Sequence, residues 1–214
     1  MPDTEHEKRE AAQAAAGLVA DGELVGLGTG TTVAYLLPAL AARGLAIRCV
    51  ATSPATERRA LDLGLEVVPF TGIERLDIAI DGADQIDPDG WLIKGGGGAH
   101  TREKVVAAAA ARFVVIGSSD KAVARIGPPV PLELLRFGID STLAALGSAR
   151  LRDVPESPDG GVIADYLEEF RDRHELSARL DGTPGVVGHG IFPPSLTADV
   201  LLAFGGRVEH RVLG

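Results

Sequence analysis

Short apolar segments that alternate with helix-like segments constrain the fold of this chain more than any other feature of its sequence. Residues 24–27, 45–50 and 76–80 are each short and mostly apolar. Such strands suit a sheet that is covered on both faces, and their alternation with helices indicates βαβ units. The first part of the chain therefore predicts an α/β fold with an open, mostly parallel, Rossmann-like sheet. Its other expected elements are strands at 65–70, 91–93 and 113–116 and helices at 7–20, 33–43, 54–63 and 102–112.

The character of the sequence changes at the proline-rich segment 127–131. Beyond it the expected order is strand, helix, strand, strand, helix, strand, with the second helix at 168–180. This order is typical of a compact α+β unit of the split βαβ, ferredoxin-like kind. Gly205 and Gly206 then join two strands in a tight turn, and we expect this pair to rejoin the first sheet. The predicted division is a Rossmann-like catalytic subdomain, residues 1–126 plus 198–214, and a smaller α+β subdomain, residues 127–197, that contacts other subunits.

The composition argues against several classes of partner and site. The 214 residues carry a net charge of −9 without a basic block, which disfavours nucleic acid and anionic membranes as partners. Cys49 is the only cysteine, so neither an internal disulfide nor a thiolate metal cluster is expected. The charged N-terminal segment lacks an apolar signal core, and no apolar run approaches the ~18 residues of a membrane-spanning helix. We therefore expect a cytoplasmic protein.

Segment 28–32, with the sequence GTGTT, follows one expected strand and opens a helix. Its glycines allow the backbone to approach a ligand, and its hydroxyls, with the helix N-terminus, favour phosphate oxygens. It lacks the third glycine of a dinucleotide fingerprint and the Gly-Lys-Ser/Thr of a Walker loop. A tight turn with a threonine cap is the alternative. Thr52, Ser53 and Thr56 follow the next strand and either cap its helix, which is the simpler interpretation, or add hydroxyls to the same pocket.

Asp81 and Asp84 follow the expected strand at 76–80. Ligands of open α/β sheets bind beyond the carboxyl ends of the strands, so both carboxylates are expected to face the same site as segment 28–32. Two acids at this spacing can also bind a metal. Scattered histidines and one cysteine offer no supporting cluster, although magnesium, which takes carboxylates and waters, stays possible. A simple Asp-Gly turn is the third interpretation.

Four consecutive glycines at 95–98 are preceded by Lys94 and followed by a helix start that carries Glu103. Such a run is unfavourable in a packed element because glycine loses the most backbone freedom on folding, so it indicates backbone N–H groups that approach a ligand. A lysine ammonium and convergent amides can stabilise an oxyanion that forms during a reaction. Glu103, with an ordinary pKa of about 4.3, is either a favourable acid in the first turn of a helix or the base of the site.

Three further residues are weaker candidates. Lys121 lies at the same expected sheet edge but by itself suggests a solvated surface charge. His100 adjoins the glycine run, where a secondary contact is conceivable, whereas His189 lies in a Gly-His-Gly segment and is expected to be a loop residue away from the site. We propose neither histidine as a catalytic group.

In this order the motifs resemble the type A family of ribose-5-phosphate isomerases. The resemblance rests on GLGTGTT at 26–32, the hydroxyl cluster at 52–57, DGAD at 81–84, KGGG at 94–97, TREK at 101–104 and DK at 120–121, with further likeness at 129–133 and 184–187. It covers nearly the whole chain. Three positions depart from the family pattern: Gln85 stands where Glu is usual, Gly98 replaces a common alanine, and Gly161 replaces a frequent asparagine.

The resemblance implies an aldose–ketose isomerase of the non-oxidative pentose phosphate pathway, which interconverts D-ribose 5-phosphate and D-ribulose 5-phosphate through an enediolate without a metal or other cofactor. It implies that Glu103 is the base, that Lys94 and the glycine amides stabilise the oxyanion, and that Asp81 and Asp84 assist ring opening. It also implies a homodimer or homotetramer. The further residues that it implies bind the sugar phosphate are Thr29, Gly30, Thr31, Thr32, Gly82, Ala83, Gly95, Gly96, Gly97, Lys121 and Lys8.

Two other functions remain open from the sequence. A sugar-phosphate deaminase or lactonase of similar fold would also use a glycine loop and carboxylates, but the spacing from Lys94 to Glu103 favours the isomerase. A non-catalytic sugar-phosphate sensor attached to a regulator would need a DNA-binding module, for which neither the length nor the charge leaves room. Retention of Asp81, Asp84, Lys94 and Glu103 together also argues against a binding domain that lacks activity.

Overall fold

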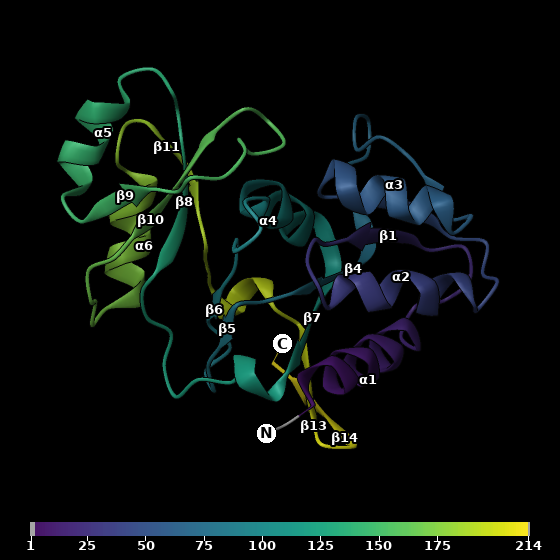
Figure 1. Cartoon of the computed structure of the whole chain (residues 1–214). Helices are drawn as coiled ribbons and strands as arrows, with labels where there is room; N and C mark the ends of the chain where they lie inside the picture. Colours follow the sequence, from purple (N-terminus) through teal and green to yellow (C-terminus); the bar gives the residue numbers. More distant parts are fainter. Residues whose placement is uncertain (1–2, 214) are drawn as a thin grey trace.

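The apolar segments of the first part of the chain form a seven-stranded sheet in the computed structural model, which describes residues 3–213 (Figure 1). All neighbouring strands are parallel except the last pair, which forms the expected hairpin and rejoins this sheet. The prediction of an open, mostly parallel sheet is therefore confirmed. In spatial order the strands are β14 (Arg207–Val212), β13 (Asp199–Phe204), β7 (Ala110–Ser118), β4 (Leu76–Gly82), β1 (Leu24–Leu27), β2 (Arg48–Ala51) and β3 (Glu66–Val67).

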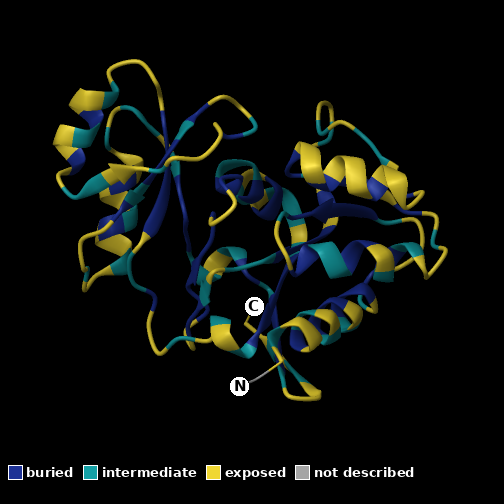
Figure 2. Ribbon diagram, viewed as in Figure 1, coloured by how far each residue is buried: buried dark blue, intermediate teal, exposed yellow. Residues whose placement is uncertain are grey.

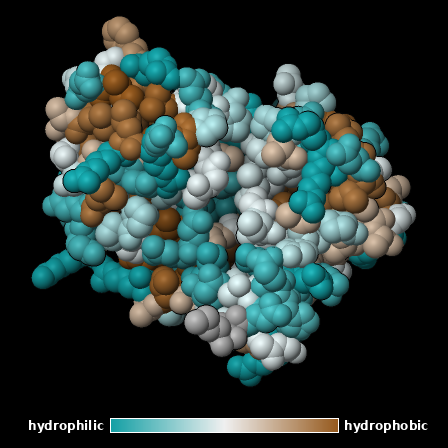
Figure 3. Space-filling view, in the orientation of Figure 1, coloured by the Kyte–Doolittle hydropathy of each residue, from teal (hydrophilic) through white to brown (hydrophobic). Residues whose placement is uncertain are grey.

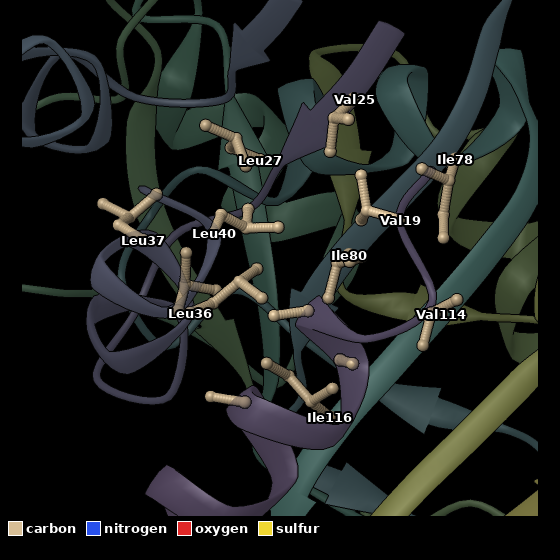
Figure 4. Packing of buried hydrophobic residues seen from close by; sticks show 14 of the residues in the cluster. Val19, Val25, Leu27, Leu36, Leu37, Leu40, Ile78, Ile80, Val114 and Ile116 are labelled. Atoms are coloured by element: carbon tan, nitrogen blue, oxygen red, sulfur yellow. The ribbon is translucent and has the colours of Figure 1, made fainter. Parts of the chain in front are cut away.

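The five inner strands of this sheet contribute side chains to two apolar clusters, one on each face. Along β7, Val114 and Ile116 join the first cluster, and Phe113 and Val115 join the second, because successive side chains point to opposite faces. The first cluster includes side chains of α1 (Thr4–Ala16), α2 (Val33–Ala41) and α3 (Pro54–Asp62), and Figure 4 shows the leucines of α2 among the strand residues. The second includes α4 (His100–Ala109). Burial on both faces explains why these strands read as continuous apolar runs.

The second part of the chain forms a four-stranded antiparallel sheet with two helices. Its elements are β8 (Val130–Leu134), α5 (Ile139–Leu146), β9 (Ala149–Leu151), β10 (Val162–Tyr166), α6 (Arg173–Asp181) and β11 (Val186–His189). The spatial order β11-β8-β10-β9 is that of the predicted ferredoxin-like unit. Side chains of both helices share one cluster with the sheet. We keep residues 127–197 as the proposed bounds of this smaller subdomain.

A small third sheet that the sequence did not predict connects the two parts. Its strands are β5 (Gln85–Ile86), β6 (Leu92–Ile93) and β12 (Ile191–Phe192), in the order β12-β6-β5. Two short 3₁₀ helices, Ser119–Lys121 and Pro194–Leu196, complete the fold. Figure 2 shows that buried residues continue from the main sheet through this region into the smaller subdomain. None of the helices in residues 3–213 combines the length and apolar character needed to cross a membrane.

Helix ends differ from the sequence prediction where local capping decides them. The last helix, expected at 168–180, begins at Arg173 because the Asp172 carboxylate accepts hydrogen bonds from the N–H groups of His174 and Glu175. Helix α4, expected at 102–112, ends at Ala109, and the chain turns directly into β7. Helix α1 begins earlier than expected, at Thr4, after Asp3 as its cap.

The order of the strands places a crevice between β1 and β4. From β1 the chain continues outward to β2 and β3, whereas β4 is followed in the opposite direction by β7 and β13. The loops that leave the carboxyl ends of β1 and β4 therefore diverge and leave room for a ligand at this switch point. These loops are residues 28–32 and the segment that begins at Asp81, the two motifs singled out from the sequence.

Candidate active site

A pocket of about 100 Å³ lies at the switch point between β1 and β4. The structure brings almost all of the predicted site residues together around it. Asp81 does not line the pocket, but its carboxylate accepts a hydrogen bond from Lys94, which does. Lys8 of α1 also lies outside the lining and pairs with Glu5 at 2.6 Å. The lining residues are Thr29, Gly30, Thr31, Thr32, Gly82, Ala83, Asp84, Lys94, Gly95, Gly96, Gly97, Glu103 and Lys121.

A buried ion cluster of two carboxylates and one ammonium lies at the bottom of the site. Lys94 Nζ lies 2.8 Å from Asp81 Oδ2 and 3.1 Å from Glu103 Oε2, and it donates to the carbonyl oxygen of Gly82 at 2.5 Å. The side chains of Asp81, Lys94 and Glu103 are each at most 4% exposed. Two of the three N–H donors of the ammonium hydrogen-bond Asp81 and Gly82, and Glu103 lies at ion-pair distance, although its Oε2 forms no hydrogen bond of normal geometry within residues 3–213. The cluster therefore holds Lys94 in one position relative to the glycine loop.

The shared burial shifts the protonation of all three groups. Burial raises the pKa of Glu103 to about 8; the negative charge of Asp81 adds to this, and Lys94 opposes it. Burial also raises the pKa of Asp81, again against the effect of Lys94. Burial alone would lower the pKa of Lys94, but the two carboxylates raise it above its ordinary value. The ammonium therefore stays charged, while Glu103 can gain or lose a proton near neutral pH, as a catalytic acid–base group requires.

Gly28 is required by Asp81. A Cβ atom on Gly28 would lie 1.9 Å from both Cγ and Oδ1 of Asp81. The close approach lets Asp81 Oδ1 accept hydrogen bonds from the N–H of Thr29 at 3.1 Å and of Gly82 at 2.7 Å. The sequence indicated that a glycine here admits a ligand; in the structure, this one admits a carboxylate of the protein itself.

The glycine loop turns at positions that favour glycine. Gly95 and Gly98 have φ of +102° and +75°, and the N–H of Gly98 donates to the carbonyl oxygen of Gly95 at 3.0 Å. The N–H of Gly96 donates to Asp84 Oδ2 at 2.7 Å. The N–H of Gly97 has no acceptor within residues 3–213. Of the three predicted amide donors, the protein itself therefore engages that of Gly96, whereas those of Gly95 and Gly97 have no acceptor within residues 3–213.

A chain of hydroxyls supports segment 28–32 from the side of α3. The Thr29 hydroxyl hydrogen-bonds with the hydroxyls of Thr52 at 2.8 Å and Thr56 at 3.3 Å. Ser53 Oγ accepts from the N–H of Thr56 at 3.2 Å and caps α3. The capping interpretation is therefore confirmed, whereas the hydroxyls of Thr52 and Thr56 support Thr29 and do not add to the pocket.

Asp81 at the end of β4 and Asp84 just after it are both engaged by protein donors. Asp81 accepts from Lys94 and two backbone amides, and Asp84 accepts from Gly96. Among residues 3–213, no three or more His, Cys, Asp or Glu side chains are grouped so that they could hold a metal ion. Lys94 thus occupies the place between the carboxylates of Asp81 and Glu103 and supplies the positive charge of the site.

Gln85 points away from the site. Its Nε2 donates to the carbonyl oxygen of Gly127 at 3.0 Å, and the N–H of Gly127 donates to its Oε1 at 2.8 Å. A glutamate has no donor for the carbonyl oxygen, so this two-point pair requires the amide. The departure from the family pattern therefore belongs to the junction with the smaller subdomain and leaves the ion cluster untouched.

Both histidines are buried beside the site. For His189, the prediction of a loop position away from the site was therefore wrong. His189 lies in β11, not in a loop; its Nδ1 accepts from the N–H of Ile191 at 3.2 Å and lies 3.4 Å from Nζ of Lys104. Its Nε2 lies 3.1 Å from Asp181. His100 is fully buried, and its ring packs against Gly95, where a Cβ would lie 2.6 Å from Nδ1. A sequence pattern carries no signal for these contacts, because residues of α4 and β11 meet only in the folded chain.

His100→Leu should abolish the part of the fall in unfolding free energy at acidic pH that this histidine causes. Burial lowers the pKa of His100 to about 3, and neither ring nitrogen forms a hydrogen bond of normal geometry within the described chain. The unfolded chain, with a pKa of about 6.5, therefore binds a proton that the folded chain does not as the pH falls. At about pH 5 the wild type should lose about 2 kcal/mol relative to about pH 8 through this group, and the variant should not.

Urea unfolding of both proteins at the two pH values checks this, with His6→Leu at an exposed histidine as control. An equal pH dependence in wild type and His100→Leu would contradict it.

Comparison with known proteins identifies related sequences and structures. The family description "Ribose 5-phosphate isomerase A (phosphoriboisomerase A)" matches residues 48–205. Ribose-5-phosphate isomerase A of Sphingopyxis alaskensis is 41% identical over 221 residues, 97% of this chain and 96% of that protein. The protein of the same name from Methanosarcina acetivorans is 44% identical over 202 residues, 87% and 86% of the two chains. A D-ribose-5-phosphate isomerase solved in complex with phospho-erythronic acid has a TM-score of 0.92 at 29% identity, over 98% of this chain and 99% of that one.

Proposed function

Because the chain belongs to the ribose 5-phosphate isomerase A family, we propose that its switch-point pocket binds D-ribose 5-phosphate and converts it to D-ribulose 5-phosphate. The family decides between this enzyme and the deaminase, lactonase or sensor that the sequence left open. The solved relative holds phospho-erythronic acid, a four-carbon acid with a phosphate at one end and a carboxylate at the other. Its carboxylate resembles the enediolate that forms when an aldose phosphate loses the proton on C2.

Glu103 is the proposed base. The single observation that supports this role most directly is its buried carboxyl, which lines the pocket with a pKa raised to about 8. As a carboxylate it takes the proton from C2 of the open-chain aldose, and as the acid so formed it returns the proton to C1. A pKa near the working pH suits both steps, because the carboxylate and the carboxylic acid are then both readily populated.

Lys94 and the glycine loop are the proposed electrostatic support for the intermediate. Charge moves onto O1 and O2 as the enediolate forms, and a fixed ammonium in a water-poor site stabilises it more than a solvated one would. Gly97 offers an N–H that no protein acceptor uses within residues 3–213. Asp81 holds Lys94 in place, and Asp84, which lines the pocket, is the proposed group for proton transfer during ring opening.

The opposite end of the pocket is proposed to hold the phosphate. Thr31 and Thr32 stand at the start of α2, where free N–H groups and the helix dipole favour an anion. Lys121 lines the same pocket and adds a positive charge. Lys8 remains a proposed second cation for the phosphate, because its pair with Glu5 is partly exposed and can exchange for a ligand.

We also propose that the enzyme works as a homodimer or homotetramer in the cytoplasm. The smaller subdomain is the proposed contact region. Leu135 and Phe137, which follow β8 and precede α5, are 51% and 92% exposed. Figure 3 shows apolar surface over this part of the molecule, and exposed apolar patches commonly mark sites of association.

The pH dependence of kcat/KM, measured with EDTA present, tests the proposed roles. Since the carboxylate is the active form of Glu103, activity should rise with pH and level off above about pH 8, the value to which burial raises this pKa. Lys94 already carries the positive charge that a metal would otherwise supply, so EDTA should leave the rate unchanged. Activity that is flat between about pH 6 and 9 would contradict the role of Glu103. Activity that is lost with EDTA and returns only with added metal would contradict the proposed role of Lys94.

A further inference from the structure

Arg152 of the smaller subdomain reaches the glycine loop with its side chain. This residue follows β9, and its N–H donates to the carbonyl oxygen of Ile163 in β10 at 2.9 Å. Its Nε and Nη2 donate to the two carboxylate oxygens of Asp165, also in β10, at 2.6 and 2.5 Å. Its Nη1 donates to the carbonyl oxygens of Gly95 at 3.2 Å and Gly96 at 3.1 Å. The guanidinium thus joins the antiparallel sheet to the loop of the catalytic pocket.

The two carbonyls that Arg152 holds determine where two amides point. In a planar trans peptide the C=O and the following N–H point in opposite directions. Fixing the oxygen of Gly95 therefore directs the N–H of Gly96, which donates to Asp84 at 2.7 Å. In the same way, fixing the oxygen of Gly96 directs the N–H of Gly97, an amide with no acceptor in residues 3–213. Arg152 thus sets the orientation of one of the donors proposed for the oxyanion.

Only an arginine fits these contacts. The planar guanidinium carries five N–H donors in a fixed fork, which here pairs with Asp165 on one side and with two carbonyls on the other. A lysine offers a point charge on a flexible stem and cannot reproduce this geometry. The side chain is 18% exposed, and its hydrogen bonds with Asp165 raise the pKa of Arg152 above its ordinary value. The charge is therefore permanent, and Asp165 balances it.

From these contacts we infer that Arg152 is a positioning residue for the isomerisation, supplied by the smaller subdomain, which holds the glycine loop so that its amides face the developing oxyanion. The inference rests on the proposed role of the loop in the reaction. It gives the smaller subdomain a part in catalysis beyond the subunit contacts proposed for it.

Other contacts keep the smaller subdomain docked when Arg152 is changed. Arg173 of α6 pairs with both Asp87 and Asp89 in the loop between β5 and β6, the latter at 2.9 Å. Gln85 and Gly127 form the two-point amide pair at the junction. Arg173 therefore provides a matched control, because it is another partly buried arginine that links the two parts but does not touch the glycine loop.

The test measures kcat and KM of the full-length wild type, Arg152→Gln, Arg152→Lys and Arg173→Gln. In Arg152→Gln the glycine loop should lose an orientation that matters only in the transition state. Its kcat should therefore fall on the order of 10–100-fold, and its KM should stay within about threefold of the wild-type value. Arg152→Lys should recover little of the rate, and Arg173→Gln should stay within about threefold of the wild type. Unchanged kcat in Arg152→Gln, or an equal loss in Arg173→Gln, would overturn the inference. If Arg152→Gln does not fold, Asp165→Asn carries the same kinetic expectation, because it leaves the guanidinium in place without its orienting charge.

Ligand binding separates a positioning role from a general structural one. Phospho-erythronic acid should bind Arg152→Gln about tenfold more weakly than wild type, because its carboxylate occupies the reacting end. Inorganic phosphate should bind both proteins equally, since the proposed phosphate end lies at α2 and Lys121. An equal weakening of both ligands would overturn the inference. A folded wild type without isomerase activity would instead overturn the proposed function from which the inference starts.

Discussion

Replacing Glu103 by glutamine should lower kcat by about 10³-fold, within the range that general acid–base groups contribute. The amide has nearly the same shape but cannot accept the C2 proton. KM should change by less than about threefold, because the proposed phosphate contacts lie elsewhere in the pocket. Removing one of two carboxylates that repel each other should leave the free energy of unfolding within about 1 kcal/mol of the wild type. A coupled assay of ribulose 5-phosphate formation and urea unfolding measure these quantities.

Glu133→Gln is the matched control for this substitution. Glu133 lies in β8, is 2% exposed and accepts a hydrogen bond from the hydroxyl of Ser157. It does not line the pocket, and an amide oxygen can keep the Ser157 contact. Its kcat should stay within about twofold of the wild type. Full activity of Glu103→Gln, with the control equally active, would mean that another group moves the proton.

Gly28→Ala should lower kcat on the order of 10²-fold although the alanine adds no charge and removes no functional group. The new Cβ would lie 1.9 Å from the Asp81 carboxyl group, which must therefore move. Moving it breaks contacts with Lys94 and with the amides of Thr29 and Gly82, and so displaces the ammonium that is proposed to stabilise the intermediate. Overpacking of this kind should also cost about 1–3 kcal/mol of stability. Steady-state kinetics and thermal unfolding measure the two effects.

Gly127→Ala provides the comparison, because a Cβ there meets no atom within 4 Å and its φ is not positive. Its backbone pair with Gln85 remains possible, so both rate and stability should stay close to those of the wild type. Near-normal turnover of Gly28→Ala would show that the position of Asp81 is not critical for the reaction.

The sequence was sufficient to predict the fold class and the grouping of most candidate site residues at one edge of the sheet. Apolar runs such as residues 24–27 and 76–80 indicate buried parallel strands, and in a parallel sheet the motifs that follow them come to one edge. The grouping of segment 28–32, Asp84 and Glu103 around one pocket follows from this rule. The ferredoxin-like order of the second part was equally accessible, because its strand and helix signals are local.

Contacts between distant segments could not be predicted. His189 was expected in a loop, yet β11 packs it beside α4, a contact that depends on how the smaller subdomain docks. Gly28 was interpreted through ligands, although the carboxylate of Asp81 is what requires it. The two-point pair of Gln85 with Gly127 likewise exists only once β5 and the junction meet. In each case the decisive partner lies far along the chain, and a pattern of neighbouring residues carries no information about it.

The position of β13 between β14 and β7 has a consequence for synthesis on the ribosome. This strand, Asp199–Phe204, pairs with β7 next to β4, whose end carries Asp81, yet the whole smaller subdomain is synthesised between β7 and β13. Until β13 emerges, β7 presents an unpaired edge to other nascent chains, and such edges promote aggregation. The main sheet therefore closes only after the smaller subdomain has been synthesised. Chaperone demand during translation should fall mainly on the interval between β7 and β13.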